Sequence, residues 1–442
     1  MSVFLAGFAR EVITPPVGVP LAGYFTPRPN RGALDDLHVK AILFSDGQTI
    51  CGVLSLDVCL MSNMLLQRIH AELERRGVVF HRNLIIAATH THTAPYTKDL
   101  FGVKADQDFM KHVADRCGEA VKRAWADLAP AELYAGHADE NPFAFCRRFH
   151  MKSGKVVTNP GKLNPDIVKP EGEVNRRVGV LRVDRCGRTL AVVANICNHT
   201  DTVDGDWVSA DWPGRLEAAL RQQAGHDVHV VTLIAPAGNI NHFDVTNNNN
   251  QSAYAEAVRI GEGYAAIVAG IMRTARRIEP VPLGVVRADL RIHARDVAAG
   301  EIEAAKTLLA APQVADGGRM TSEELAQGSN AVQRFFAAEL VGFAELEAGK
   351  TRLFETTCLK FGSGAAIVSL PGEPFAEIGM RIQERSPFPE IIVASLSQGS
   401  CGYVPLEECF GRGGYETLIV RGGGASSDTV RLLIETAGSL LQ

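Results

Sequence analysis

The sequence of 442 residues has no long hydrophobic segment and no strong excess of charge of either sign. Its apolar stretches, such as Ala191–Ile196 and Ile391–Ala394, are far shorter than the roughly 20 residues that a membrane-spanning helix needs. Lys and Arg total 45 against 50 Asp and Glu, which gives a formal net charge of −5. Because there is no basic excess, we expect neither nucleic acid nor a stably bound membrane as a partner.

Cysteine is sparse and irregularly placed, with nine residues and no CxxC pair. The first residues also lack the basic segment and long apolar segment of a secretory signal peptide. An odd number of cysteines without an export signal predicts reduced, mostly buried thiols and a cytoplasmic location. Hydrophobic residues make up 46% and charged residues 21%, which indicates a globular chain rather than a disordered one.

Short apolar runs bounded by turn residues recur along the chain, and their length and their Val and Ile content predict buried strands. These runs are Ala41–Phe44, Gly52–Leu56, Leu84–Ala88, Leu190–Ile196, Val228–Ile234, Ala365–Leu370 and Ile391–Leu396. Amphipathic helical patterns lie between several of them, at Asn63–Arg76, Phe109–Trp125 and Pro213–Gln223. The alternation predicts an α/β fold, a mixed α+β layered sandwich. We expect a single catalytic domain over residues 1–442, with a helical excursion at residues 298–349 that is broken at residues 316–318.

Polar segments follow five of the predicted strands and carry the candidate site residues. They are Thr89–Pro95 with His90 and His92, Asn195–Thr202 with His199, Ile234–Asp244 with Asn239 and Asn241, Ser369–Pro374 with Glu373, and Gln398–Pro405 with Tyr403. Each segment alone also fits a structural role, such as a loop histidine, an Asx turn, a first-turn glutamate or an aromatic plug. Five such segments together predict one polar site where the strands end.

The spacing of His90 and His92 is the sharpest local signal. On an extended segment, residues two apart point to the same side, so both imidazoles would converge. Such a pair suits a divalent metal, usually zinc. Two hydrogen-bonded structural histidines would give the same spacing, so this motif alone leaves both interpretations open.

In order and in context, these motifs make the chain similar to the neutral (alkaline, non-lysosomal) ceramidases, a family of zinc-dependent amide hydrolases. The resemblance runs through Gly7–Pro16, Leu54–Asp57, Thr89–Pro95, Asn198–Thr200, Pro236–Asn241, Pro371–Glu373 and Gly402–Val404. It implies a neutral-ceramidase-like catalytic domain with one Zn²⁺ per chain, held by His90, His199, Glu373 and Tyr403. It also implies that His92 stands near the scissile carbonyl and that Arg147, or the adjacent Arg148, lines the pocket.

Two features depart from that family. Asn241 stands where the ceramidases carry a catalytic Ser, and an asparagine cannot act as an acyl-accepting nucleophile. The sequence also ends at Gln442, soon after the Tyr403 segment, so we expect the C-terminal β-sandwich domain of ceramidases to be absent. Ceramide is therefore not the expected substrate.

These features predict a zinc-dependent hydrolase of an amide bond in a soluble small molecule, with a metal-activated water as the nucleophile. The expected roles are His92 as general base or acid, Asn241 or Asn239 and Tyr403 as oxyanion donors, Arg147 as the partner of an anionic substrate group, and Asp57 and Asp201 as carboxylates that orient a ligating His. The alternatives are a lipid N-acyl amidase, an ester or lactone hydrolase, and a catalytically silent metal- or ligand-binding protein. The choice between zinc and another divalent metal, and a homo-oligomeric state, stay open.

Overall fold

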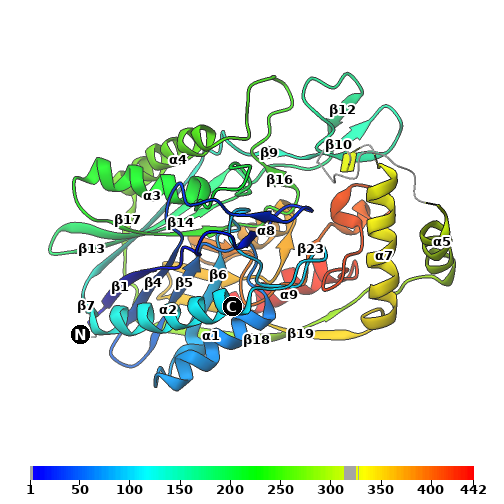
Figure 1. The fold of residues 1–442 in the computed structure, drawn as a ribbon. Helices are drawn as coiled ribbons and strands as arrows, with labels where there is room; N and C mark the ends of the chain where they lie inside the picture. The colour runs from blue at the N-terminus through cyan, green and yellow to red at the C-terminus, as the bar shows by residue number, and fades with distance from the viewer. Residues whose placement is uncertain (1–2, 313–324, 327) are drawn as a thin grey trace.

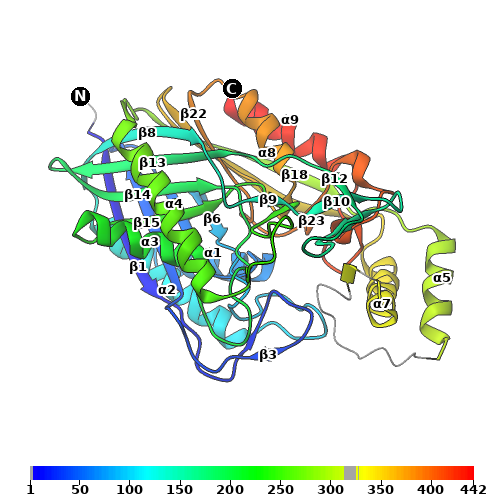
Figure 2. The same ribbon diagram turned by 90° about the horizontal axis from the view of Figure 1, so that it is seen from above.

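Three β-sheets occupy the centre of the molecule, and helices cover their outer faces (Figures 1 and 2). The computed structural model describes residues 3–312, 325–326 and 328–442. The inner faces of all three sheets share one apolar core, in which Phe44 of the first sheet lies edge-on against Phe361 of the third, with ring centroids 4.9 Å apart. Val183 of the second sheet belongs to the same core. The predicted layered α/β class is therefore confirmed.

The first sheet has the strand order β6-β5-β4-β1-β7. Its strands are β1 Leu5–Val12, β4 His38–Ser45, β5 Ile50–Leu56, β6 Leu84–Ala88 and β7 Ala129–Pro130, and its outer helices are α1 Asn63–Arg75 and α2 Gln107–Ala126. Helix α1 begins after Ser62, whose side chain accepts a hydrogen bond from the backbone amide of Leu65. Leu65, Ile69 and Leu73 follow at helical spacing and are buried, so one face of α1 packs on the sheet.

The second sheet has the order β15-β14-β13-β8-β17. Its strands are β8 Glu132–Asp139, β13 Arg177–Arg185, β14 Arg188–Ile196, β15 His229–Ile234 and β17 Arg276–Ile278, and its outer helices are α3 Asp211–Ala224 and α4 Tyr254–Thr274. The third sheet has the order β18-β19-β20-β22. Its strands are β18 Leu283–His293, β19 Thr351–Phe361, β20 Ala365–Ser369 and β22 Glu390–Ala394, and its outer helices are α8 Ala376–Glu384 and α9 Thr429–Leu441.

Shorter strands pair outside these sheets. They are β2 Pro20–Leu21 with β3 Arg28–Pro29, β9 Phe145–Cys146 with β16 Ile240–Asn241, β10 Arg148–Met151 with β11 Val156–Thr158 and β12 Ile167–Pro170, and β21 Glu373–Pro374 with β23 Tyr403–Val404.

Each sheet ends in one parallel pair, namely β5 with β6, β14 with β15, and β20 with β22. Backbone hydrogen bonds join the carboxyl ends of these strands across the sheets. The amide of Ala88 donates to the carbonyl of Leu396 over 3.0 Å, and the amide of Ser395 donates to the carbonyl of Ile234 over 2.8 Å. One region of the molecule therefore contains the starts of the loops that follow β6, β14, β15, β20 and β22. This proximity allows the five polar segments to form a single site.

The helical excursion consists of α5 Ala299–Ala310 and α7 Asn330–Leu346, which stand next to each other at one side of the molecule (Figures 1 and 2). Arg334 of α7 ties the two helices together by donating to the carbonyls of Leu308 and Leu309. The predicted break at residues 316–318 lies outside the described residues. On its other side, α7 places Phe336 edge-on to Phe25 and Tyr415, so this helix contacts the loops of the site.

The seven predicted strands all exist, and β6 begins and ends where the sequence predicted. All nine cysteines are free and all except Cys186 are buried, as expected for reduced thiols. Among the described residues, no helix combines the length and the apolar character that crossing a membrane requires.

Candidate metal centre

Three buried side chains from three different loops meet at the ends of the strands. The Nε2 atoms of His90 and His199 lie 2.9 Å apart, and Oε2 of Glu373 lies 3.3 Å from the first and 3.9 Å from the second. Ligands held about 2.0–2.1 Å from one zinc ion in a tetrahedron lie about 3.3–3.4 Å from one another. The three separations bracket that value, so these side chains are spaced for a single small cation.

The electrostatics of this cluster also fit a cation. Oε2 of Glu373 is buried and has no hydrogen-bond donor in the part of the chain that the structure describes. Burial raises the pKa of Glu373, but His90 outweighs it and lowers that pKa to about 2. The carboxylate therefore stays ionised and keeps an oxygen free for a positive charge, which is the chemistry of a metal ligand.

The backbone fixes the tautomer of both imidazoles. Nδ1 of His90 lies 2.6 Å from the carbonyl oxygen of Cys59, and Nδ1 of His199 lies 3.4 Å from that of Ala237. Because a carbonyl only accepts, each Nδ1 donates its hydrogen, and each Nε2 is left as the ring nitrogen that can bind a cation or a proton. Two lone pairs 2.9 Å apart repel unless a cation or a proton lies between them.

The orienting groups differ from the sequence prediction. Asp57 accepts from the hydroxyl of Thr89 and from the amide of His38, and it lies 3.8 Å from the amine of Lys40. Asp201 pairs with His242 at 3.0 Å. Neither carboxylate bonds His90 or His199, because the carbonyls that follow the strand ends already occupy their Nδ1 positions. The prediction that Asp57 and Asp201 orient the ligands is therefore wrong.

The segment that carries His90 and His92 is not extended. Strand β6 ends at Ala88, and His90 adopts a left-handed backbone conformation with φ of 69°. In any residue other than glycine, this conformation costs free energy, and residues with such backbone strain are concentrated at functional sites. The two imidazoles still converge, with their Nε2 atoms 3.3 Å apart, but the turn at His90 brings this about rather than the alternation of a strand.

His92 sits at the edge of the cluster and contacts the loop after β2. An added Cβ on Gly23 would lie 2.4 Å from Cβ of His92, and the ring of Tyr24 lies edge-on to the imidazole. Burial and the neighbouring His90 lower the pKa of His92 to about 3. The imidazole is therefore neutral near pH 7.

Tyr403 stands beside Glu373 because β21 and β23 pair in parallel, with these two residues in register. Burial and the Glu373 carboxylate raise the pKa of the Tyr403 phenol well above its usual value. The guanidinium of Arg147 lies over the ring, 5.3 Å from its centroid. The phenol therefore lies beside Glu373 and Arg147, and its role as a metal ligand stays a prediction.

Arg147, rather than Arg148, is the arginine at the cluster. Its Nη1 lies 3.3 Å from Nε2 of His199, its Nη2 donates to the carbonyl of Gly238 over 2.7 Å, and its Nε pairs with Glu416 over 2.8 Å. Arg148 points elsewhere and pairs with Glu171 and with the second oxygen of Glu416. Arg147 is therefore already neutralised by a buried carboxylate.

Asn241 is buried but is engaged away from the cluster. Its side-chain amide donates to Asn159 over 2.9 Å and its oxygen accepts from the amide of Phe243. Asn239 donates to Glu377 and accepts from the amide of Ala376, at the start of α8. An oxyanion-binding role for either residue stays a prediction, and these hydrogen bonds show a structural role for both.

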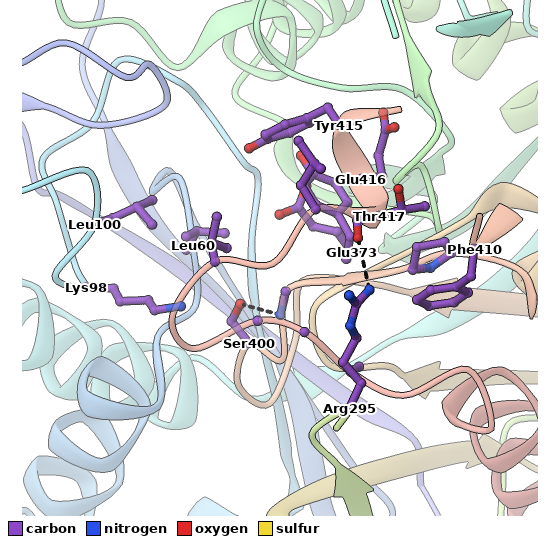
Figure 3. Close-up of a pocket in the computed structure, with 18 of the residues that line it drawn as sticks. Leu60, Lys98, Leu100, Arg295, Glu373, Ser400, Phe410, Tyr415, Glu416 and Thr417 are labelled. Atoms are coloured by element: carbon purple, nitrogen blue, oxygen red, sulfur yellow. Dashed lines mark hydrogen bonds between the residues drawn. The ribbon is translucent and has the colours of Figure 1, made fainter. Parts of the chain in front are cut away.

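A pocket opens beside the cluster, and Figure 3 shows the side chains that line it. It encloses about 630 Å³ of space that continues into solvent, and its lining includes Glu373, Tyr403, Tyr415, Glu416, Lys98, Arg295, Leu60, Leu100 and Phe101. Glu416, Tyr415, Lys98 and Cys59 were missed by sequence reasoning. Cys59 lies three residues after the predicted strand Gly52–Leu56, whereas Lys98, Tyr415 and Glu416 do not closely follow a predicted strand. Two buried neighbouring arginines, which require an acidic partner, were the one signal for Glu416.

Comparison with solved structures identifies this architecture. The structure of neutral ceramidase from Pseudomonas aeruginosa matches 100% of this chain and 75% of its own, with a TM-score of 0.74 and 16% sequence identity. The chain has the fold of a neutral ceramidase. A ceramidase described as complexed with C2 matches the same shares of the two chains, with a TM-score of 0.75 and 15% identity. In sequence, no family model and no curated protein matches the chain.

The neutral-ceramidase-like fold confirms the resemblance that the motifs indicated. At 15–16% identity it establishes how the chain is folded, so the chemistry rests on the cluster itself. A second, overlapping group of donors exists there, because Cys59 also lies within ligand distance of His90 and His92.

Proposed function

We propose that this protein is a zinc-dependent hydrolase that cleaves an amide bond in a small molecule, with His90, His199, Glu373 and Tyr403 as the metal ligands. The observation that carries the proposal is the buried oxygen of Glu373, which has no hydrogen-bond donor in the described part of the chain and lies 3.3 Å from Nε2 of His90 and 3.9 Å from Nε2 of His199. Zinc bound there supplies a Lewis acid and lowers the pKa of a water molecule to roughly 7.

The other roles in the proposed reaction belong to His92, Tyr403 and Arg147. His92 is neutral near pH 7 and stands 3.3 Å from His90, so it is placed to take a proton from the attacking water and to return it to the leaving amine. Tyr403 lies in register with Glu373, so its hydroxyl is placed beside the other ligands and near the oxygen on which charge develops. Arg147 is held between Glu416 and His199, and its Nη1 lies 3.3 Å from Nε2 of His199.

Two observations support an amide as the bond that is cleaved: the fold, and the absence of a nucleophilic side chain at position 241. The two structural neighbours are ceramidases by name, and ceramide is an amide. The chain has Asn241 where those enzymes are expected to have a catalytic Ser, so direct attack by water is the route that needs no nucleophilic side chain.

Elemental analysis of the purified chain, combined with a screen of N-acyl compounds for hydrolysis, tests the proposal. We expect about one zinc per chain, and we expect His90→Ala and His199→Ala to lose metal and activity together. His92→Ala should lose activity and keep most of its metal, because His92 is not assigned as a ligand. His112→Ala is the matched control, since His112 lies exposed on α2.

Two outcomes would overturn the proposal. Unchanged zinc content in the His90 and His199 variants would refute the ligand assignment. A fully metallated protein that cleaves none of the N-acyl compounds, esters or lactones offered would instead indicate a metal- or ligand-binding protein without catalysis.

A further inference from the structure

The amine of Lys98 enters the pocket beside the metal cluster. Lys98 lines the same cavity as Glu373 and Tyr403, and its charged end points toward the loop that carries Ser400 (Figure 3). One hydrogen bond holds the amine, to the carbonyl oxygen of Gly422 at 3.1 Å. An ammonium group has three donors, so two of them remain for a molecule in the pocket.

No carboxylate of the described residues lies within ion-pair distance of Lys98. The two acids that act on it most strongly, Glu347 and Glu339, are both occupied. Glu347 binds Arg352 at 3.5 Å and the amide of Gly422 at 2.7 Å, whereas Glu339 binds the guanidinium of Arg421. Within the described residues, the charge of Lys98 therefore has no ion-pair partner.

Burial and the nearby Arg352 cation lower the pKa of Lys98, so holding a charged amine here costs free energy. An anion bound beside the amine would offset this cost. Arg295 lines the same pocket from another segment, but it donates to the carbonyl of Thr417 and pairs with Glu301 at 3.3 Å, so its charge is already matched (Figure 3).

The loop of Lys98 is held rigidly on both sides. The carbonyl of Thr97 accepts from the hydroxyl of Ser62 over 2.5 Å, and the hydroxyl of Thr97 donates to the carbonyl of Leu60 over 2.7 Å. On the other side, Asp99 accepts from the amide of Ala105 over 3.0 Å. The backbone of Lys98 is thus fixed before any ligand arrives, which lowers the entropic cost of binding.

The other pocket walls are apolar or already paired. Leu60, Leu100 and Phe101 form an apolar wall next to Lys98, and Tyr415 continues it toward Tyr403. Arg147, which the sequence suggested for an anionic substrate group, is occupied by Glu416. Among the residues that the structure describes, the pocket therefore offers the candidate metal ligands, an apolar wall and one cation, Lys98, without a carboxylate partner.

We infer that Lys98 recognises a carboxylate on the substrate, so that the substrate class of this site is N-acyl amino acids with an apolar acyl group. This inference rests on the proposed amide hydrolysis. The proposed function names the bond that is cleaved, and the inference names the class of substrate that contains this bond. Lys98 acts here as a residue that determines specificity and takes no part in the chemical step.

Paired substrates that differ in the carboxylate alone test the inference. N-Octanoylglycine is compared with N-methyloctanamide, and N-benzoylglycine with N-methylbenzamide, on the zinc-loaded wild type and on Lys98→Met, Lys98→Arg and Lys104→Met. Lys104 is the matched control because it lies on the same loop with an exposed side chain that pairs with Asp99. Calorimetric titration of both octanoyl compounds into the same proteins gives a readout that does not need turnover.

The wild type is expected to prefer the carboxylate compounds by about 10- to 100-fold in kcat/KM, the range for a hydrogen bond to a charged group. Lys98→Met should bring that ratio close to one, Lys98→Arg should retain part of it, and Lys104→Met should leave it unchanged. The loss should fall mainly on KM.

The failure of this inference and the failure of the proposed function look different. Hydrolysis of both members of a pair without preference, or a preference that survives in Lys98→Met, would overturn the role of Lys98. Lys98-dependent binding of N-octanoylglycine without any hydrolysis would overturn the proposed function and support the recognition of the carboxylate. The absence of both binding and hydrolysis would overturn both.

Discussion

Replacing Glu416 by glutamine removes the negative charge that two buried arginines share. The Glu416 side chain is fully buried and accepts from Nε of Arg147 at 2.8 Å, from Nη1 of Arg148 at 2.6 Å and from the hydroxyl of Thr158 at 2.8 Å. The two guanidinium groups hold the pKa of Glu416 below its usual value although burial opposes them. Glu416→Gln keeps the shape of the side chain and leaves Arg147 without any carboxylate.

The expected cost follows from the burial. Removing one partner of a buried ion pair costs about 3–5 kcal/mol, because the remaining charge stays desolvated. Arg148 keeps Glu171 as a second partner, so Arg147 carries most of this cost. Unfolding entropies of about 2.1 cal/mol/K per residue translate the loss into a Tm lower by about 3–5 °C for a chain of this length.

Differential scanning calorimetry of the two proteins under identical conditions measures the change. Glu435→Gln is the control, because Glu435 forms an exposed pair with Arg431 on α9 and should shift Tm by less than about 1 °C. A Glu416→Gln protein with the Tm of the wild type would show that Arg147 does not depend on this carboxylate, and the electrostatic description of the site would be wrong.

Two further perturbations address the position of His92 and the acid sensitivity of the core. Gly23→Ala places a Cβ 2.4 Å from Cβ of His92, whereas the Cβ of Gly18→Ala, at a similarly positive φ, has no neighbour within 4 Å. Gly23→Ala should therefore lower kcat/KM on the order of 100-fold, and Gly18→Ala should leave it unchanged. Both variants should keep their metal. Burial and Lys40 lower the pKa of His229 to about 3. The unfolded chain takes up this proton near pH 6.5, so stability falls as pH drops below that value, by at most about 1.4 kcal/mol per pH unit. His229→Phe, which keeps the stacking on Phe8, should flatten this fall in thermal unfolding between pH 7 and pH 5.

The strands and the loops that follow them were predictable because both signals are local. The run Leu84–Ala88 is apolar throughout and becomes the buried strand β6, and His90 lies two residues beyond its end. Glu373 lies four residues after the end of β20 and Tyr403 nine residues after the end of β22, and the parallel pairing of β21 with β23 brings them together. The polar segments therefore come together because the strands that precede them end in the same region.

The remaining features depend on contacts between distant segments. Lys98 and Glu416 are separated by more than 300 residues in the sequence, and both line the pocket without following a predicted strand. Asp57 was expected at a histidine, yet the buried Lys40 lies beside it in the core. Whether a buried carboxylate pairs with a lysine, an arginine or a histidine is decided by packing across sheets, which periodicity along the chain does not report.

Anomalous diffraction at the zinc absorption edge, from crystals of the zinc-loaded chain, tests the central claim most directly. The account predicts a single strong peak per chain, bounded by Nε2 of His90, Nε2 of His199 and Oε2 of Glu373, with Tyr403 completing the site. A peak held by Cys59, His90 and His92 instead, or no peak at the cluster, would contradict it.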